Sequence, residues 1–189
     1  IVHHLAGITD VAYVKKESDK AKDDLTAKVA IEGTANVLKS MNAEATIVFP
    51  STHVVFEGLK EQKENLDENE KTNTFLAYST SKVKNENQII KSGKNYAIFR
   101  LGSVYGFSTD TMRINIMPNL FSKITSQNGK IKLFGGGVQL KSLVPLLDVA
   151  RCFKFVEEKA DFKNGIYNLS KENVTVKDVA NICKKINPK

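Results

Sequence analysis

Short apolar segments that alternate with helical segments are the feature that most restricts how this chain can fold. Residues 1–6, 45–49 and 96–101 are each short, mostly apolar and followed by a turn, as buried strands of a parallel sheet are. Between them, helical patterns cover residues 19–41 and 78–91. Strand, loop and helix units in succession predict an α/β fold with a parallel sheet.

The pattern changes after Gly106, where the segments become shorter and mixed. We expect a helix, a short strand, an apolar segment, a helix, a strand and a last helix, over residues 116–126, 131–134, 144–147, 148–158, 166–169 and from Thr175 onward. Gly135-Gly136-Gly137 does not follow a buried strand and open a helix, so it predicts a turn and not a phosphate-binding loop. The chain therefore divides into residues 1–106 and a smaller α+β lobe, residues 107–189.

The charge pattern limits the partners of the chain. Its 28 Lys and Arg against 21 Asp and Glu give a formal net charge of +7, but the lysines are spread among acidic residues with no basic block. This predicts a solvated surface and no nucleic-acid partner. Cys152 and Cys183 show no disulfide pattern or metal-ligand spacing, and His3 and His4 have no third ligand nearby, so we expect no metal and a reducing, cytoplasmic location. No apolar run is long enough to cross a membrane.

Tyr78 and Lys82 are the residues with the clearest potential for chemistry. Positions i and i+4 of a helix lie on one face, so both side chains can point into one site. A free phenol has a pKa of about 10, and a cation nearby favours its ionised form, so the pair suits general-base catalysis. The alternative is a packed Tyr and a solvated Lys, a pairing that occurs by chance in many helices.

Hydroxyl side chains follow the apolar segment 45–49. Ser51 and Thr52 come directly after Pro50, at the carboxyl end of a predicted parallel strand, where open α/β sheets bind their ligands. The alternative is an ordinary polar loop or a helix cap. Both interpretations stay open on this segment alone.

Several segments spread over nearly the whole chain resemble motifs of one family. They are His4 to Gly7, Gly33 to Asn36, Pro50 to Thr52, the Tyr78/Lys82 pair, Arg100 to Gly106, Asn115 to Pro118 and Gly135 to Ala150. In this order they resemble the extended short-chain dehydrogenase/reductases, specifically the NAD-dependent epimerase/dehydratase family that acts on nucleotide sugars. The resemblance implies a Rossmann-like, doubly wound parallel sheet with a smaller C-terminal α+β substrate lobe.

The resemblance also implies how the chain is organised. The family's Gly-x-x-Gly-x-x-Gly fingerprint and the acidic residue that binds the adenosine ribose should precede Ile1, so we expect a partial domain that lacks the first βαβ units and belongs to a longer protein. Residues 1–106 would be the C-terminal part of the NAD(P)-binding domain, and residues 107–189 mainly the substrate-binding lobe. Relatives usually dimerise through the helix around Gly33 and the Tyr78/Lys82 helix, which implies a homodimer.

The resemblance assigns roles to individual residues. Tyr78 would abstract a proton from a sugar hydroxyl while hydride passes to NAD, with NADP as the alternative cofactor. Lys82 would lower the Tyr78 pKa and bind the nicotinamide ribose, and Thr52 would bind the reacting oxygen. The other residues implied at the cofactor are Leu5, Ala6, Gly7, Pro50, Ser51 and Leu101. Those implied at the substrate, besides Thr52, are His53, Ser103, Asn115 and Lys141.

Some positions depart from the family pattern. Ala30 and Ser103 stand where Asn is usual, and Lys141 stands where an Arg commonly clamps the nucleotide phosphates. His53-Val54 replace the acidic residues that sugar dehydratases place after the Ser or Thr. Elimination chemistry is therefore disfavoured, and epimerisation or simple oxidation and reduction remains.

Three functions stay open. The first is an NAD-dependent nucleotide-sugar epimerase, similar to UDP-hexose 4-epimerases, that works by transient hydride transfer. The second is a reductase or dehydrogenase of the same family that releases its cofactor in each cycle. The third is a non-catalytic binding protein that keeps the fold. The departures above motivate the third, and the joint presence of Thr52, Tyr78 and Lys82 opposes it, because only catalysis requires the three together.

Overall fold

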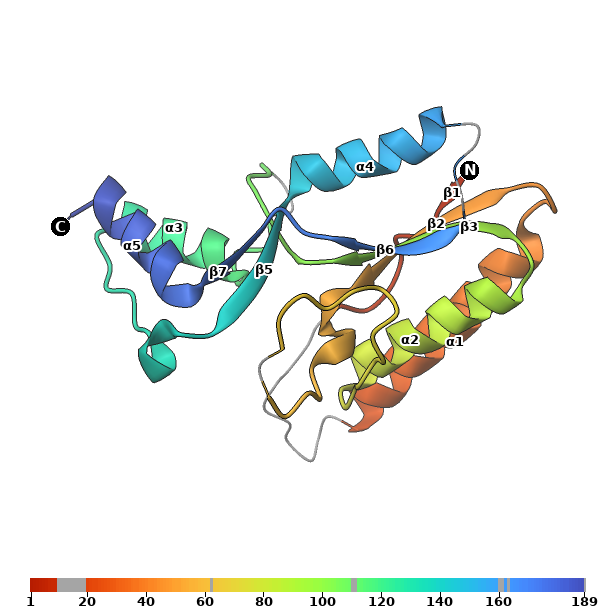
Figure 1. Cartoon of the computed structure of the whole chain (residues 1–189), viewed down its shortest axis with the longest axis horizontal. Helices are drawn as coiled ribbons and strands as arrows, with labels where there is room; N and C mark the ends of the chain where they lie inside the picture. Colours follow the sequence, from red (N-terminus) through yellow and green to blue (C-terminus); the bar gives the residue numbers. More distant parts are fainter. Residues whose placement is uncertain (10–19, 62, 110–111, 160–161, 163, 189) are drawn as a thin grey trace. The chain divides into compact units, whose positions relative to one another are not determined.

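The computed structural model describes residues 1–9, 20–61, 63–109, 112–159, 162 and 164–188, which form two compact units (Figure 1). Unit 1 comprises Ile1–Arg100 and Phe155–Asn168, and unit 2 comprises Leu101–Lys154 and Leu169–Lys189. Each unit thus combines two separate stretches of sequence. The functional division predicted after residue 106 stays a prediction.

Unit 1 is built on a four-stranded sheet. Its strands are β1 (Val2–His3), β2 (Thr46–Thr52), β3 (Asn95–Leu101) and β6 (Gly165–Leu169), in the order β1-β2-β3-β6. β1 pairs with β2 in parallel, with Val2 opposite Ile47. Consecutive residues Ile47, Val48 and Phe49 are all buried, as in a strand that is covered on both faces. The predicted α/β fold is therefore confirmed.

Two helices, α1 (Lys20–Ser40) and α2 (Ala77–Lys91), pack side by side in unit 1 (Figure 1). The predicted start of the first helix at Asp19 lies outside the described residues. Polar contacts join the two helices, since the side chains of Asn85 and Gln88 donate to the carbonyl oxygens of Ala30 and Ile31, at 2.9 and 3.1 Å. The apolar core lies between the helices and the sheet and consists of Met41, Ile47, Phe49, Ile89 and Ile98.

The connection from β2 to α2 begins with a short 3₁₀ helix, η2 (His53–Phe56). β2 runs three residues beyond the predicted end of its apolar segment, through Pro50 to Thr52, so the two hydroxyl residues lie in the strand itself. The polar stretch 65–74 contains turns and no helix or strand, as its composition predicts.

Unit 2 contains a mixed sheet of three strands, which agrees with the predicted α+β character. The strands are β4 (Ser103–Tyr105), β5 (Leu140–Pro145) and β7 (Glu172–Thr175), and β5 pairs in parallel with β4 and antiparallel with β7. The helical elements are α3 (Met117–Ser126), the 3₁₀ turn η3 (Phe134–Gly137), α4 (Leu146–Glu158), whose last residues belong to unit 1, and α5 (Val176–Ile186). None of the helices in the described part of the chain is long and apolar enough to span a membrane.

The prediction of a strand at residues 131–134 is wrong. Residues 131–133 have no regular structure, and Phe134 begins η3. Burial does alternate along the stretch, but no described strand lies beside it to pair with its backbone. Gly135 and Gly136 then adopt positive φ angles of 55° and 69°, which turn the chain out of an extended path and confirm the predicted glycine turn. The short strands β4 and β7 were not predicted, because their few residues are only partly buried.

Candidate active site

α2 carries Tyr78 near its start and Lys82 one turn later. The Nζ atom of Lys82 lies 5.9 Å from the centre of the Tyr78 ring and 4.4 Å from the centre of the Phe49 ring. Phe49 belongs to β2, so this face of the helix is turned toward the strand that ends in Ser51 and Thr52. The structure thus brings Tyr78 and Lys82 together in unit 1.

Lys82 is a largely buried cation whose donors are only partly used. Its Nζ donates a hydrogen bond to the carbonyl oxygen of Pro50 at 2.7 Å. Burial lowers the pKa of Lys82 from 10.5 to about 8, and the carboxylate of Glu86 acts in the opposite direction. At pH 7 the side chain is therefore mostly protonated. Two of its three N–H groups have no hydrogen-bond partner among the residues that the structure describes.

A small cavity adjoins Tyr78 and Lys82 at the carboxyl end of β1. Ala6 and Gly7 contribute to its lining, and a Cβ atom built on Gly7 would meet no atom of the described residues within 4 Å. Leu5 does not line the cavity, and its side chain is 60% exposed. Two of the three residues predicted at the cofactor in this segment therefore lie beside the Tyr78/Lys82 pair.

His4 lines the same cavity from the core side. Its Nε2 lies 2.9 Å from the hydroxyl oxygen of Thr34 on α1, and this oxygen also accepts a hydrogen bond from the side chain of Asn85 on α2. Burial, and secondarily the charge of Lys82, lower the pKa of His4, so the imidazole is neutral at pH 7. Among the described residues, no group of three His, Cys, Asp or Glu side chains is arranged to hold a metal ion. His4 is thus a neutral, hydrogen-bonded part of the core.

Thr52 ends β2 and caps the 3₁₀ helix that follows. Its side-chain oxygen accepts a hydrogen bond from the backbone N–H of Val54 at 3.2 Å, which confirms the cap interpretation of this segment. The side chain is buried, and its hydroxyl proton has no acceptor among the described residues. The geometry leaves this proton available for a ligand oxygen, and the catalytic role of Thr52 stays a prediction.

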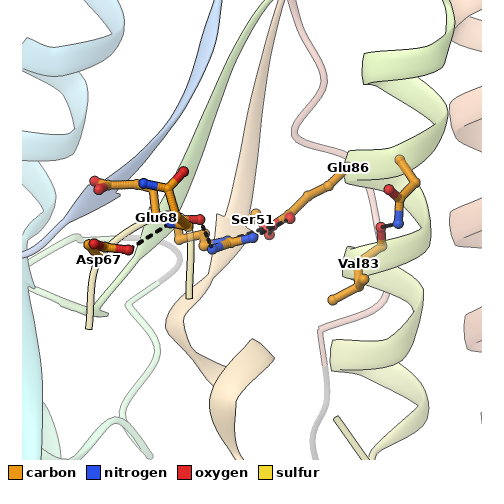
Figure 2. Close-up of polar contacts among 8 residues, drawn as sticks. Ser51, Asp67, Glu68, Val83 and Glu86 are labelled. Atoms are coloured by element: carbon orange, nitrogen blue, oxygen red, sulfur yellow. Dashed lines mark hydrogen bonds and ion pairs between the residues drawn. The ribbon is translucent and has the colours of Figure 1, made fainter. Parts of the chain in front are cut away.

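Ser51 lies next to a buried ion pair that includes Glu86 (Figure 2). Glu86 follows Lys82 by one helical turn on α2. Arg100 of β3 donates from Nε and Nη2 to the two carboxylate oxygens of Glu86, at 3.2 and 2.9 Å, and both side chains are only 4% exposed. The Ser51 hydroxyl donates to the same carboxylate, and Nη1 of Arg100 donates to the carbonyl oxygen of Glu68 at 3.1 Å. These contacts join β2, β3, α2 and the loop after η2, and three of them meet at Glu86, one helical turn after Lys82.

Glu57 places a second, partly buried carboxylate at the start of α2. One of its oxygens, Oε1, accepts hydrogen bonds from the backbone N–H groups of Phe75 and Leu76, at 3.0 and 2.8 Å, and from the Ser79 hydroxyl. The other oxygen, Oε2, is buried and has no hydrogen-bond partner among the described residues. Glu57 therefore links the end of η2 to the beginning of the helix that carries Tyr78.

The sequence offered unequal signals for these supporting residues. Glu86 lies four residues after Lys82, so helical spacing alone could have put it on the same face. Glu57, Thr34 and Asn85 reach the partners described above across 18 to 55 positions of sequence, and no local pattern marks them.

Residues 1–170 match the model of the NAD dependent epimerase/dehydratase family. The chain belongs to this family. The resemblance that the motifs show is therefore confirmed, and it extends over most of the sequence. No curated protein matches the chain.

Solved structures share the fold of this family member. The UDP-glucose 4-epimerase of Thermus thermophilus, in complex with NAD, matches with a TM-score of 0.78 and 21% identity over 99% of this chain and 61% of that one. The UDP-glucuronic acid 4-epimerase of Bacillus cereus, in complex with UDP-glucuronic acid and NAD, matches with a TM-score of 0.80 and 19% identity over 98% of this chain and 58% of that one. MoeE5, in complex with UDP-glucose and NAD, matches with a TM-score of 0.79 and 16% identity over 98% of this chain and 62% of that one. The chain spans about three fifths of the length of these proteins, and identities this low show the fold alone.

The remaining predicted site residues of this family member lie in both units. In unit 1, Pro50 and Ser51 contact Lys82 and Glu86, and His53 begins η2. The other four, Leu101, Ser103, Asn115 and Lys141, belong to unit 2 and are not part of the site described above. The side chain of Asn115 is exposed and accepts a hydrogen bond from Nε of Arg113 at 3.1 Å, and Lys141 is exposed on β5.

Proposed function

We propose that the protein is an NAD-dependent epimerase that acts on a nucleotide sugar, a UDP-hexose 4-epimerase or a close relative. The observation that carries the proposal is the placement of Tyr78 beside a buried, mostly protonated Lys82 near the carboxyl ends of β1 and β2. Support for the substrate class and the cofactor comes from the solved structures of the same fold, which include UDP-sugar 4-epimerases in complex with NAD.

The residues around Lys82 fit a nicotinamide nucleotide. Lys82 is a partly buried ammonium with two N–H donors that are unused among the described residues. It requires acceptors there, and ribose hydroxyl oxygens would supply them. Ala6, with its small side chain, and Gly7, with none, line the adjoining cavity. Leu5, Pro50, Ser51 and Leu101 complete the proposed cofactor set. When bound, NAD would accept and return the hydride.

In the proposed reaction, Tyr78 takes the proton from the sugar hydroxyl that is oxidised and later returns it. The ammonium of Lys82 favours the phenolate form of Tyr78. Thr52 donates its hydroxyl proton, which has no acceptor among the described residues, to the reacting oxygen. Proton transfer at a positioned phenol is general acid–base catalysis.

The neighbours of Thr52 favour epimerisation over elimination. Dehydration of a sugar requires a second acid beside the reacting carbon, and the residues that follow Thr52 are His53 and Val54. In unit 2, we propose that Ser103, Asn115 and Lys141 contact the substrate, with His53 and Thr52 from unit 1. Lys141 would offer its positive charge to the diphosphate without the two-pronged geometry of an Arg.

The decisive test replaces the Tyr78 hydroxyl alone. Tyr78→Phe is expected to reduce turnover of UDP-hexoses by roughly 100- to 10,000-fold, because it removes the proton acceptor and keeps the ring. The circular dichroism spectrum and melting temperature should stay unchanged. Tyr96→Phe, which changes a partly buried tyrosine in the core, is the matched control and should turn over normally. Normal turnover of Tyr78→Phe would exclude the proposed mechanism.

Cofactor retention separates the epimerase from its nearest alternative. An epimerase recycles its own NAD, so denatured full-length protein should release NAD or NADH in nearly equal molar amount to the chain. A reductase or dehydrogenase of the same fold would release little and would depend on added NAD(P)H. Failure to bind either cofactor would favour the non-catalytic binding protein.

We also propose that the protein forms a homodimer through α1 and α2. Leu25 and Val29 of α1 are 53% and 40% exposed, and Ile90 of α2 is 40% exposed. Nothing in the described part of the chain packs within 4 Å of a Cβ built on Gly33, so a helix of a second copy could approach it closely. Sedimentation of the wild type against Leu25→Glu tests this proposal, and the charged variant should sediment as a monomer.

A further inference from the structure

We propose that Glu57 is a positioning residue that fixes the start of α2, and with it Tyr78, relative to Thr52 at the end of β2. The proposal rests on the proposed catalytic role of Tyr78. It assigns no contact of Glu57 with the substrate or with the cofactor. Its effect on the reaction would be exerted through the helix.

The first observation is that α2 begins without a cap of its own. The residue at the N-cap position is Leu76, which has no side-chain acceptor for the free N–H groups of the first turn. The Glu57 carboxylate comes from a distant part of the chain and bonds the segment that enters the helix. Its Oε1 accepts from the N–H of Phe75, just before the N-cap, from the N–H of Leu76, the N-cap itself, and from the Ser79 hydroxyl in the first turn. Hydrogen bonds to a carboxylate are stronger than those to a neutral acceptor, and a negative charge suits a helix N-terminus.

The second observation is where Glu57 lies relative to Thr52. The 3₁₀ helix η2 has only four residues, with Thr52 as its N-cap and Glu57 as its C-cap. Glu57 bonds in turn to Leu76, two residues before Tyr78. One turn of 3₁₀ helix and one carboxylate therefore connect Thr52 to the start of the helix that carries Tyr78. Along the backbone, the same two residues are connected only through the loop of residues 58–75.

The third observation is that backbone hydrogen bonds and close packing hold Asn73 against the backbone on either side of Glu57. The N–H of Gly58 donates to the carbonyl oxygen of Asn73 at 2.8 Å, and the N–H of Asn73 donates to the carbonyl oxygen of Val55 at 2.9 Å. A Cβ atom on Gly58 would lie 2.5 Å from Oδ1 and 3.0 Å from the carbonyl oxygen of Asn73, so any side chain there would displace Asn73. These contacts bring the end of the loop against η2 and present Phe75 and Leu76 to the carboxylate.

Because one oxygen of Glu57 makes all the hydrogen bonds, the effect of these bonds can be tested separately from the effect of the negative charge. All three donors bind Oε1, while Oε2 is buried without a partner among the described residues. Glu57→Gln keeps a carbonyl oxygen for the three donors and removes the charge. Glu57→Ala removes both. The two variants therefore distinguish a positional role from an electrostatic one.

The test uses the full-length protein with three variants and one control. Glu57→Ala is expected to lower kcat by roughly 10- to 100-fold with KM within about threefold, because a displacement of about 1 Å at a catalytic group has an effect of this size. Glu57→Gln should restore kcat to within about threefold of the wild type, and Ser79→Ala should fall between the two. Glu61→Ala, which removes a neighbouring exposed carboxylate, should behave as the wild type.

A second readout does not depend on turnover. Amide hydrogen exchange of Glu57→Ala should lose protection at residues 75–80 and keep it in the rest of α2, and the side-chain NMR signals of Tyr78 should shift. Unchanged kcat, equal damage from Gln and Ala, or loss of protection along the whole helix would each overturn the proposal. If the wild type fails to turn over nucleotide sugars, the proposed function fails, and the exchange pattern still decides whether Glu57 fixes the start of α2.

Discussion

The two units of this protein differ in how they treat polar side chains. In unit 1, polar side chains are buried and several of them hydrogen-bond to one another. The buried polar residues are His4, Thr26, Thr34, Ser51, Thr52, Ser79, Ser81, Asn85, Glu86 and Arg100. Among the described residues of unit 2, no polar residue is buried, while exposed large apolar residues occur in both units, for example Phe75 in unit 1 and Phe107 in unit 2. Unit 1 thus resembles a rigid frame for a site, and unit 2 a surface whose polar groups face solvent.

The difference affects how many alternative side-chain arrangements each unit can adopt. A fully bonded buried polar network permits few alternative arrangements, because each change leaves a donor or acceptor unpaired in a medium of low dielectric constant. The network of Ser51, Glu86 and Arg100 includes the carboxylate one helical turn after Lys82, whose charge raises the Lys82 pKa, so it lies where the proposed chemistry needs accurate geometry. Recognition of a flexible diphosphate by exposed side chains needs less accuracy. We therefore expect substitutions in unit 1 to affect stability and catalysis together, and substitutions in unit 2 to affect binding.

Breaking the buried ion pair should have the largest effect on stability. Arg100→Met keeps much of the side-chain volume but leaves the Glu86 carboxylate buried with only the Ser51 hydroxyl, which is expected to lower the free energy of unfolding by about 3–5 kcal/mol. Urea unfolding monitored by circular dichroism measures the change. The second substitution Glu86→Leu in the same chain should recover part of the loss, since it removes the unpaired charge.

Arg151→Met is the matched control for this prediction in unit 2. Arg151 pairs with Asp148 at 2.8 Å, but its side chain is 76% exposed. Surface pairs contribute little, so the loss should stay below about 1 kcal/mol. Equal losses of unfolding free energy in Arg100→Met and Arg151→Met would contradict the prediction that the buried ion pair of unit 1 contributes more to stability than the exposed pair of unit 2.

Lys82→Met should abolish the proposed turnover and yet stabilise the folded protein at pH 7. Lowering the pKa of Lys82 from 10.5 to about 8 corresponds to roughly 3 kcal/mol of unfavourable burial. Part of this is offset by the bond to Pro50, which leaves an expected gain of about 1–2 kcal/mol. Lys84→Met, an exposed position on the same helix, should change stability little.

The pH dependence of that gain sharpens the prediction. Between pH 8 and 10.5 the unfolded chain retains a proton on Lys82 that the folded chain has released, so the stability of the wild type rises with pH in this window. The advantage of Lys82→Met should therefore shrink above pH 8 at about 1.4 kcal/mol per pH unit and be lost at about pH 9 to 9.5. A constant difference over this range would show that the charge of Lys82 is not what destabilises the fold.

The smallest effect on stability is expected in unit 2. Lys141 is exposed on β5, so Lys141→Ala should change the free energy of unfolding by less than about 0.5 kcal/mol. If Lys141 binds the diphosphate, the KM for a UDP-hexose should rise roughly tenfold with kcat nearly unchanged. Lys171→Ala, another exposed lysine of unit 2, should leave both constants unchanged. A large loss of kcat in Lys141→Ala would contradict the assignment of unit 2 to binding.

The sequence by itself determined the architecture and the residues of the proposed chemistry. Apolar segments with period and length typical of buried strands predicted β2 and β3, and the Tyr78/Lys82 spacing predicted a shared helix face. These signals are local, since they depend on burial and on helical geometry over a few residues. The same local reasoning failed at residues 131–134, where an alternating pattern had no neighbouring strand to pair with.

Only the tertiary structure decided what surrounds the pair. The contacts of Glu57 with Leu76, of Ser51 with Glu86 and of His4 with Thr34 join residues 19 to 35 positions apart. Such contacts depend on which strand lies beside which helix, and any of many polar residues could have met there. Burial sets the pKa of Lys82 near 8 for the same reason, because desolvation belongs to the packed fold and not to the neighbours in sequence.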